Sequence, residues 1–214
     1  AGYALLPNLK DAVYDVSEYG VPQKRKRVII FAVSEKHYGD SAKKIVDQFY
    51  AALNEMKCAN VRTVREAFKG LPSFTPLNDY IMQSGKRCSY ESVNRNKDPN
   101  HNPRFHNKRD IETFKILCED IESGENKYVS IEALKKLYTA RTGKESAIHK
   151  YHVIRWDQTS NLIPAHLYKD GLRHIHPDSK QARSITVREA ARLMTFPDSY
   201  KLQGSRGDKY KILG

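Results

Sequence analysis

One short stretch near the start of the chain combines charge and spacing in a way that could support chemistry. In Gln23-Lys-Arg25-Lys-Arg27, a glutamine and two arginines alternate with lysines and directly precede the apolar run at residues 28–33. A guanidinium offers a rigid fork of donors to a negatively charged group, which an ammonium does not. A solvated basic turn before a strand would have the same composition, so the stretch needs support from elsewhere in the chain.

A second arginine-bearing segment begins about 155 residues downstream, with Arg183-Ser-Ile-Thr186-Val-Arg188-Glu189. Thr186 and Glu189 have the spacing of a capping box, in which each side chain satisfies a backbone donor of the other. This predicts a helix over residues 187–194. One face of that helix carries an apolar stripe made of Val187, Ala190, Ala191 and Met194. We expect Arg188, on another face, to pair with a carboxylate or to hold a neighbouring region.

The pentapeptide Thr-Val-Arg-Glu-Ala occurs twice, at residues 63–67 and 186–190. The sequences that flank the two copies do not match. We therefore interpret them as two helix starts with the same cap, and not as an internal repeat.

The rest of the sequence must supply the elements that position these segments. The apolar run at residues 28–33 predicts a strand buried on both faces. Apolar residues repeating at three and four positions predict helices over residues 40–57, 109–122 and 131–141. Residues 83–110 hold seven Lys or Arg against three acids, which predicts a long basic loop. Residues 150–176 suit short strands and turns.

Composition limits the classes of protein that the chain can represent. Among 214 residues, 37 Lys and Arg stand against 25 Asp and Glu, a net charge of +12 that favours a polyanionic partner. No apolar run approaches the roughly 18 residues of a membrane span. The three cysteines are scattered, which favours a reducing compartment. His174 and His176 would share a strand face, but without a third ligand we predict no zinc site.

The two arginine-bearing segments together resemble signatures of the DNA cytosine-5 methyltransferases. Residues 23–27 resemble the family's Gln-x-Arg-x-Arg motif, and residues 183–198 resemble its later R-x-x-T-x-R-E-A-x-R-L motif followed by Phe-Pro-Asp. Residues 63–72 and 166–171 also resemble family segments. Residues 209–214 look like the approach to the family's last motif.

Other parts of the family's pattern are not found in this sequence. The family attacks carbon 6 of a flipped cytosine with a Cys in a Pro-Cys motif, whereas Cys58, Cys88 and Cys118 follow Lys57, Arg87 and Leu117. The family's Glu-Asn-Val and Phe-x-Gly-x-Gly segments are not found either. The resemblance therefore implies the C-terminal portion of such an enzyme, inactive alone, with S-adenosylmethionine held mainly by residues outside this chain. We expect both ends to be cuts through a larger protein.

The resemblance also implies roles for individual residues. Arg27 would reach the target base, Arg25 would brace the site or a phosphate, and Gln23 would organise the turn. Direct base contact by the helix at 187–194 is not favoured. We expect contacts with double-stranded DNA from seven arginines: Arg25, Arg87, Arg95, Arg104, Arg155, Arg183 and Arg188.

We predict an α+β, or mixed α/β, chain. Residues 1–35 would be the last strands of a methyltransferase sheet, residues 36–182 a linker helix and a small loop-rich target-recognition domain, and residues 183–214 a helix motif that joins the two. The chain would recognise DNA and position the base for methylation, in the bacterial cytoplasm beside the nucleoid and within a restriction-modification system. Two alternatives are a non-catalytic sequence-specific DNA-binding module and the subunit of a split enzyme. An RNA-binding module fits less well, because no RNP-like aromatic signature is present.

Overall fold

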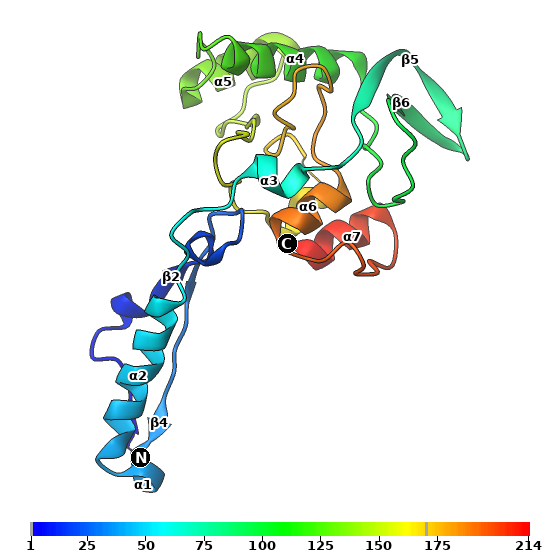
Figure 1. Ribbon diagram of the computed structural model, residues 1–214. Helices are drawn as coiled ribbons and strands as arrows, with labels where there is room; N and C mark the ends of the chain where they lie inside the picture. Colours follow the sequence, from blue (N-terminus) through cyan, green and yellow to red (C-terminus); the bar gives the residue numbers. More distant parts are fainter. Residues whose placement is uncertain (1, 170) are drawn as a thin grey trace.

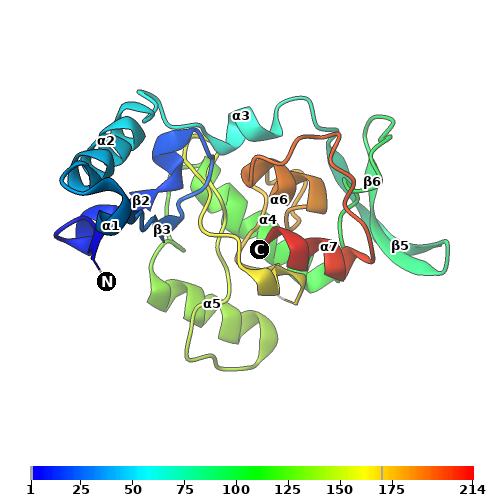
Figure 2. The same ribbon diagram turned by 90° about the horizontal axis from the view of Figure 1, so that it is seen from below.

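The computed structural model describes residues 2–169 and 171–214. Its mixed α/β chain has two parts, which are clearest in Figure 1. Residues 2–57, which we call the arm, extend away from a larger body that contains residues 62–169 and 171–214. Viewed from below, in Figure 2, the arm and the β5–β6 hairpin lie at opposite ends of the molecule.

The arm contains short strands packed on one long helix. Strands β1 and β4 pair antiparallel, as do β2 and β3. Six buried residues form its core: Ala12, Tyr14, Val33, Ala42, Val46 and Tyr50. In chain order, the elements are β1 (Tyr3–Ala4), η1 (Leu9–Ala12), β2 (Val13–Asp15), η2 (Val16–Tyr19), β3 (Lys26–Val28), β4 (Val33–Ser34), α1 (Glu35–Tyr38) and α2 (Ser41–Glu55).

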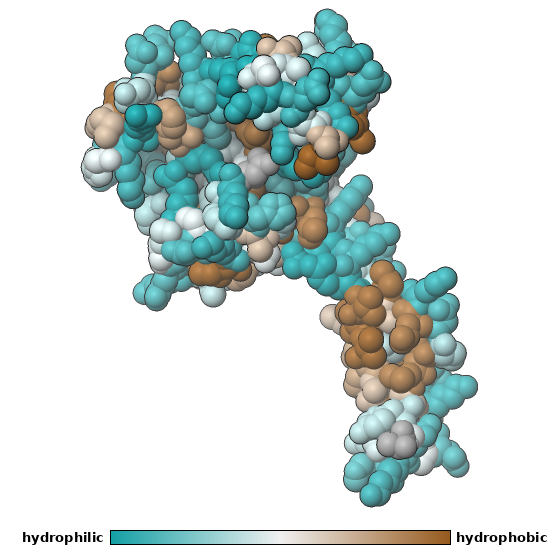
Figure 3. All heavy atoms as spheres, turned by 180° about the vertical axis from the view of Figure 1, so that it is seen from behind, coloured by the Kyte–Doolittle hydropathy of each residue, from teal (hydrophilic) through white to brown (hydrophobic). Residues whose placement is uncertain are grey.

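The predicted buried strand over residues 28–33 is wrong. The strand β3 ends at Val28, and Val28, Ile29 and Ile30 are 56%, 37% and 59% exposed. The Tyr50 hydroxyl on α2 donates to the Ile29 carbonyl at 2.8 Å and accepts from the Phe31 amide at 3.1 Å. These contacts hold one side of the segment to α2, and its apolar side chains are exposed. Figure 3 shows an apolar surface on the arm.

The body is mainly helical and carries one hairpin. The helices predicted from periodicity are confirmed, but the predicted basic loop at 83–110 is partly wrong, because it begins with the turn and second strand of the hairpin. Ser84 and Gly85 form this turn with φ of 50° and 73°, which suits a two-residue hairpin. The elements are α3 (Val64–Phe68), β5 (Phe74–Gln83), β6 (Lys86–Ser92), α4 (Lys108–Glu122), α5 (Ile131–Thr142), η3 (Ala165–Tyr168), α6 (Val187–Leu193) and α7 (Arg206–Leu213).

Two apolar cores hold the body together. One lies between α3, α6, α7 and η3, and the other joins α4 and α5 to residues 151–153. The short strands predicted at 150–176 appear only as isolated bridges, of which Ile175 makes two, to Val153 and Ser184. Within the described residues, no helix is both long and apolar enough to cross a membrane.

The two Thr-Val-Arg-Glu-Ala segments build α3 and α6, which pack against each other. Val64 and Ala67 from α3 share one core with Val187 and Ala190 from α6. Both helices begin with the predicted capping box. The same five letters therefore place the same apolar residues in one interface, although the two segments are far apart in the sequence.

Candidate nucleic-acid interface

The turn that carries Gln23 lies where the arm meets the body. The Lys24 amide donates to the Ser160 carbonyl at 2.9 Å, and the Ser160 amide donates to the Pro22 carbonyl at 3.0 Å. Gln23 is fully buried, and its Nε2 donates to the sulfur of Met194, the residue that ends α6, at 2.9 Å. The two arginine-bearing segments of the sequence therefore meet at this junction.

Strand pairing positions Arg25 and Arg27 just beyond this junction. Arg27 lies opposite Tyr14 in the β2–β3 pair, and the Asp15 carboxylate accepts the Arg25 backbone amide at 3.1 Å. Partial burial, and then the charge of Arg27, lower the pKa of Arg25. Neither arginine forms an ion pair within the described residues. Two neighbouring, unneutralised guanidiniums create a local field that attracts an anion.

Arg183, predicted to contact DNA, is instead a buried structural residue. It is 0% exposed, and its Nη1 and Nη2 donate to the two carboxylate oxygens of Glu189 at 2.7 and 2.6 Å. Burial alone would raise the pKa of Glu189, but the Arg183 guanidinium outweighs burial and holds that pKa well below its usual range. The Gln181 amide oxygen accepts from Nε and Nη2 of Arg183, and the Ser184 carbonyl accepts from Nη1, so the guanidinium is directed into the protein.

Arg188 also serves the fold. It is buried and forms ion pairs with Asp98, in the loop after β6, and with Asp198, which follows α6. Its backbone amide donates to the Asn100 carbonyl at 2.9 Å. The predicted carboxylate partner is confirmed, but the predicted DNA contact by Arg188 does not fit a guanidinium that is turned into the protein.

Two further predicted DNA contacts are half-buried in the body. Arg104 donates to the Leu167 carbonyl at 3.0 Å and lies over the Tyr210 ring at 4.9 Å. Arg155 lines a cavity of about 110 Å³ beside the α4–α5 core. Arg104 therefore ties η3 to α7, whereas Arg155 lies beside the α4–α5 core.

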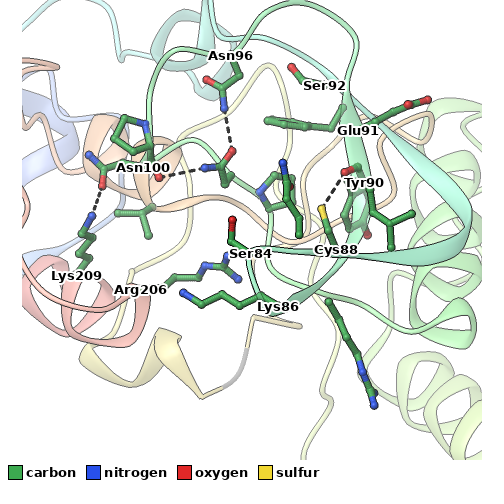
Figure 4. A pocket seen from close by; sticks show the side chains of 18 of the residues that line it. Ser84, Lys86, Cys88, Tyr90, Glu91, Ser92, Asn96, Asn100, Arg206 and Lys209 are labelled. Atoms are coloured by element: carbon green, nitrogen blue, oxygen red, sulfur yellow. Dashed lines mark hydrogen bonds between the residues drawn. The ribbon is translucent and has the colours of Figure 1, made fainter.

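Arg87 and Arg95 are exposed and line a basic groove, which we call the hairpin groove. This groove, of about 880 Å³, lies between β5–β6, the loop at 93–103 and the start of α7. Figure 4 shows Lys86 and Arg206 reaching into it from β6 and α7. Lys209, also from α7, is the fifth basic residue that lines the groove.

The three cysteines differ in burial, whereas His174 and His176 are both buried. Cys58 is exposed, Cys88 is half-buried and Cys118 is buried. Burial lowers the pKa of His174 to about 4 and of His176 to about 3, so both are neutral near pH 7. Within the part of the chain that the structure describes, no three potential metal ligands lie together.

Comparison with known proteins decides the family. Residues 2–214 match the model of the C-5 cytosine-specific DNA methylases. The chain belongs to this family. It is 30% identical over 231 residues to the type II methyltransferase M.Bpa9945I of Bacillus paralicheniformis, covering all of this chain and 49% of that protein. It is 26% identical to the type II methyltransferase M.Eco47II of Escherichia coli, covering all of this chain and 42% of that protein.

The chain thus spans about half the length of these methyltransferases. A solved structure of a putative DNA modification methyltransferase encoded within a prophage of E. coli is also similar, with a TM-score of 0.48 and 19% identity. That alignment covers 99% of this chain and 56% of the other.

The structure brings two of the methylase-like segments into contact. Residues 23–27 and 183–198 adjoin through Gln23 and Met194. In the segment at 166–171, residue 170 lies outside the described residues. Sequence reasoning missed Lys86, Arg206 and Lys209, because only the fold brings the end of the chain beside the hairpin.

Proposed function

We propose that this chain is the target-recognition and base-positioning portion of a DNA cytosine-5 methyltransferase. The complete enzyme would transfer a methyl group from S-adenosylmethionine to carbon 5 of cytosine in double-stranded DNA. The observation that carries this proposal is the junction itself. There Gln23 contacts the end of α6, while Arg25 and Arg27 remain without acidic partners among the described residues.

Each residue of the turn has a chemical role in the proposal. Attack of a thiolate on carbon 6 of the flipped base leaves negative charge on the cytosine ring, and a positioned guanidinium at O2 stabilises that charge. Arg27 would make this contact, and Arg25 would brace the site or a phosphate. Gln23 would hold the turn. Its burial and its contact with Met194 hold the turn against the end of α6.

The partner in this proposal is the N-terminal catalytic portion, in the same polypeptide or in a separate subunit. It would supply the cysteine nucleophile and most of the S-adenosylmethionine site. Residues 1–35 would complete its sheet, residues 36–182 would recognise DNA and residues 183–214 would join the two. The exposed Val28, Ile29 and Ile30 support this division, because exposed apolar patches mark interaction surfaces.

The test measures methyl transfer from labelled S-adenosylmethionine to duplex DNA. The chain alone should transfer none, and addition of the N-terminal portion should restore transfer. Arg27→Ala should lower kcat at least 100-fold, as loss of one charge-stabilising donor does, while DNA affinity falls much less. Lys26→Ala, which removes the neighbouring exposed charge, is the matched control. Methylation by the isolated chain, or equal losses of kcat and affinity, would refute these roles.

A non-catalytic DNA-binding module is the second candidate. The net charge of +12 suits contact with phosphates, and none of the three cysteines follows a proline. This candidate predicts duplex binding that persists when the N-terminal portion restores no methyl transfer. It leaves the buried contact of Gln23 with Met194 without a catalytic purpose. We therefore favour the methyltransferase portion.

A further inference from the structure

The hairpin groove gathers positive charge from parts of the sequence that are far apart. Lys86 and Arg87 come from β6, Arg95 from the loop that follows, and Arg206 and Lys209 from α7. Among the described residues that line the groove, Glu91 is the one acidic residue. Five like charges held around one hollow repel each other, so the groove favours an anion with several charges.

These five charges are not neutralised within the described residues. None of them forms an ion pair there, unlike Arg183, Arg188 and Arg192 of the same body. Lys209 donates to the Asn100 amide oxygen at 2.7 Å, a neutral partner. The groove charges are therefore available to a ligand.

The β5–β6 hairpin has the shape and side chains to lie against a nucleic acid. Arg87 is held over the rings of Tyr80 and Phe105, with its guanidinium carbon 5.1 and 5.9 Å from the two ring centres. This stacking restrains the guanidinium before a ligand arrives. Ile81 and Met82 are more than half exposed near the turn. A two-stranded ribbon of this kind fits the major groove of duplex DNA.

The groove also carries neutral donors suited to phosphate oxygens. Ser84, Ser92, Asn94 and Asn102 line it together with the basic residues. Side chains of these types make many of the phosphate and sugar contacts in protein–DNA complexes. A groove lined by three separate segments suits a stretch of backbone better than a single small anion.

The position of the groove separates it from the proposed catalytic turn. Figures 1 and 2 both place the hairpin at the end of the body far from the arm. We propose that the hairpin groove binds the phosphate backbone of duplex DNA that flanks the target cytosine. The identification of the ligand as DNA rests on the proposed function. The groove supplies affinity and orientation, and it contributes nothing to the chemical step.

The first experiment measures the salt dependence of binding, with the 214-residue chain and a fluorescent duplex oligonucleotide as the probe. Each phosphate contact contributes about 0.9 to the slope of log K against log salt. The double variant Lys86→Gln/Arg206→Gln should therefore lower the magnitude of the slope by about 2. The matched control is Lys43→Gln/Lys44→Gln, which removes two exposed charges from α2 and should leave the slope unchanged. Equal slopes for the two double variants would overturn the proposal.

The second experiment separates the groove from the proposed function. With the N-terminal portion added, the groove variant should raise KM for DNA about tenfold or more and leave kcat unchanged. A parallel loss of kcat would overturn the assignment to flanking DNA. If no methyl transfer is restored but the groove variant still lowers the salt slope, the groove survives and the proposed function fails. Tighter binding of single-stranded RNA than of duplex DNA would overturn the choice of ligand.

Discussion

Arg183 differs from Arg87 and Arg95 in the acidic partner that the fold brings to it. Arg183 reaches Glu189 because the chain reverses at the Thr186 cap, which brings residues six apart in sequence to within 2.6 Å. Arg87 and Arg95 find no such partner among the described residues and stay exposed. The sequence alone groups these arginines as predicted DNA contacts, whereas burial separates those that hold the fold from those that can reach a ligand.

The buried pair of Arg183 and Glu189 should make the fold sensitive to a conservative substitution. Arg183→Lys keeps the charge but loses the fork that engages both oxygens of Glu189. Because a damaged buried ion pair is strongly destabilising, the free energy of unfolding should fall by about 3 kcal/mol. Urea denaturation followed by the fluorescence of Trp156, the single tryptophan, measures this loss. Trp156 packs against Phe68 and His176 in the same body.

Arg95→Lys is the matched control for this measurement. Arg95 is exposed, so its substitution should change the free energy of unfolding by no more than about 0.5 kcal/mol. A loss for Arg183→Lys as small as this would contradict the structural role of the Arg183–Glu189 pair.

The helices α3 and α6 begin with the same capping box but differ in the burial of the threonine that caps them. Thr63 caps α3 near the surface, where its hydroxyl accepts the Glu66 amide at 3.3 Å. Thr186 caps α6 in the core, and its hydroxyl also lies 2.9 Å from Nδ1 of His101. The same substitution should therefore have different costs in the two helices.

Thr63→Val should lower the free energy of unfolding by about 1 kcal/mol, the usual cost of losing a cap. Thr186→Val also leaves a buried histidine nitrogen without its partner, so its cost should be about 2–3 kcal/mol. Urea denaturation of both variants, followed by Trp156 fluorescence, gives the comparison. Equal losses would mean that the contact with His101 adds nothing to the cap.

Local signals explain which elements could be predicted from the sequence. Apolar periodicity and caps act within a few residues and therefore predict helices from local sequence. The structure contains the predicted helices. The prediction of a buried strand at 28–33 is wrong because an apolar run does not specify which elements will cover it. The hairpin was missed because charges and asparagines outweighed the Ser84–Gly85 turn. The hairpin groove could not be predicted, since α7 and β6 meet only through tertiary packing.

Buried histidines make the free energy of unfolding of the whole molecule depend on pH. Burial lowers the pKa of His106 and His176 to about 3 and of His174 to about 4, against about 6.5 when unfolded. Below pH 6.5 the unfolded chain therefore binds protons that the folded chain does not, and acid favours unfolding. Glu189, whose pKa is held low, acts in the same direction only at more acidic pH, near the usual pKa of a carboxyl.

The free energy of unfolding should therefore fall between pH 6.5 and pH 5. Each buried histidine contributes a slope of about 1.4 kcal/mol per pH unit when its unfolded form is protonated and its folded form is not. Urea denaturation across this range measures the summed slope. His106→Asn should reduce the slope by about one proton, whereas His37→Asn, at an exposed position, should leave it unchanged. A flat profile in the wild-type chain would mean that these histidines take up protons in the folded state, and that their surroundings are far more open to water than the packed body implies.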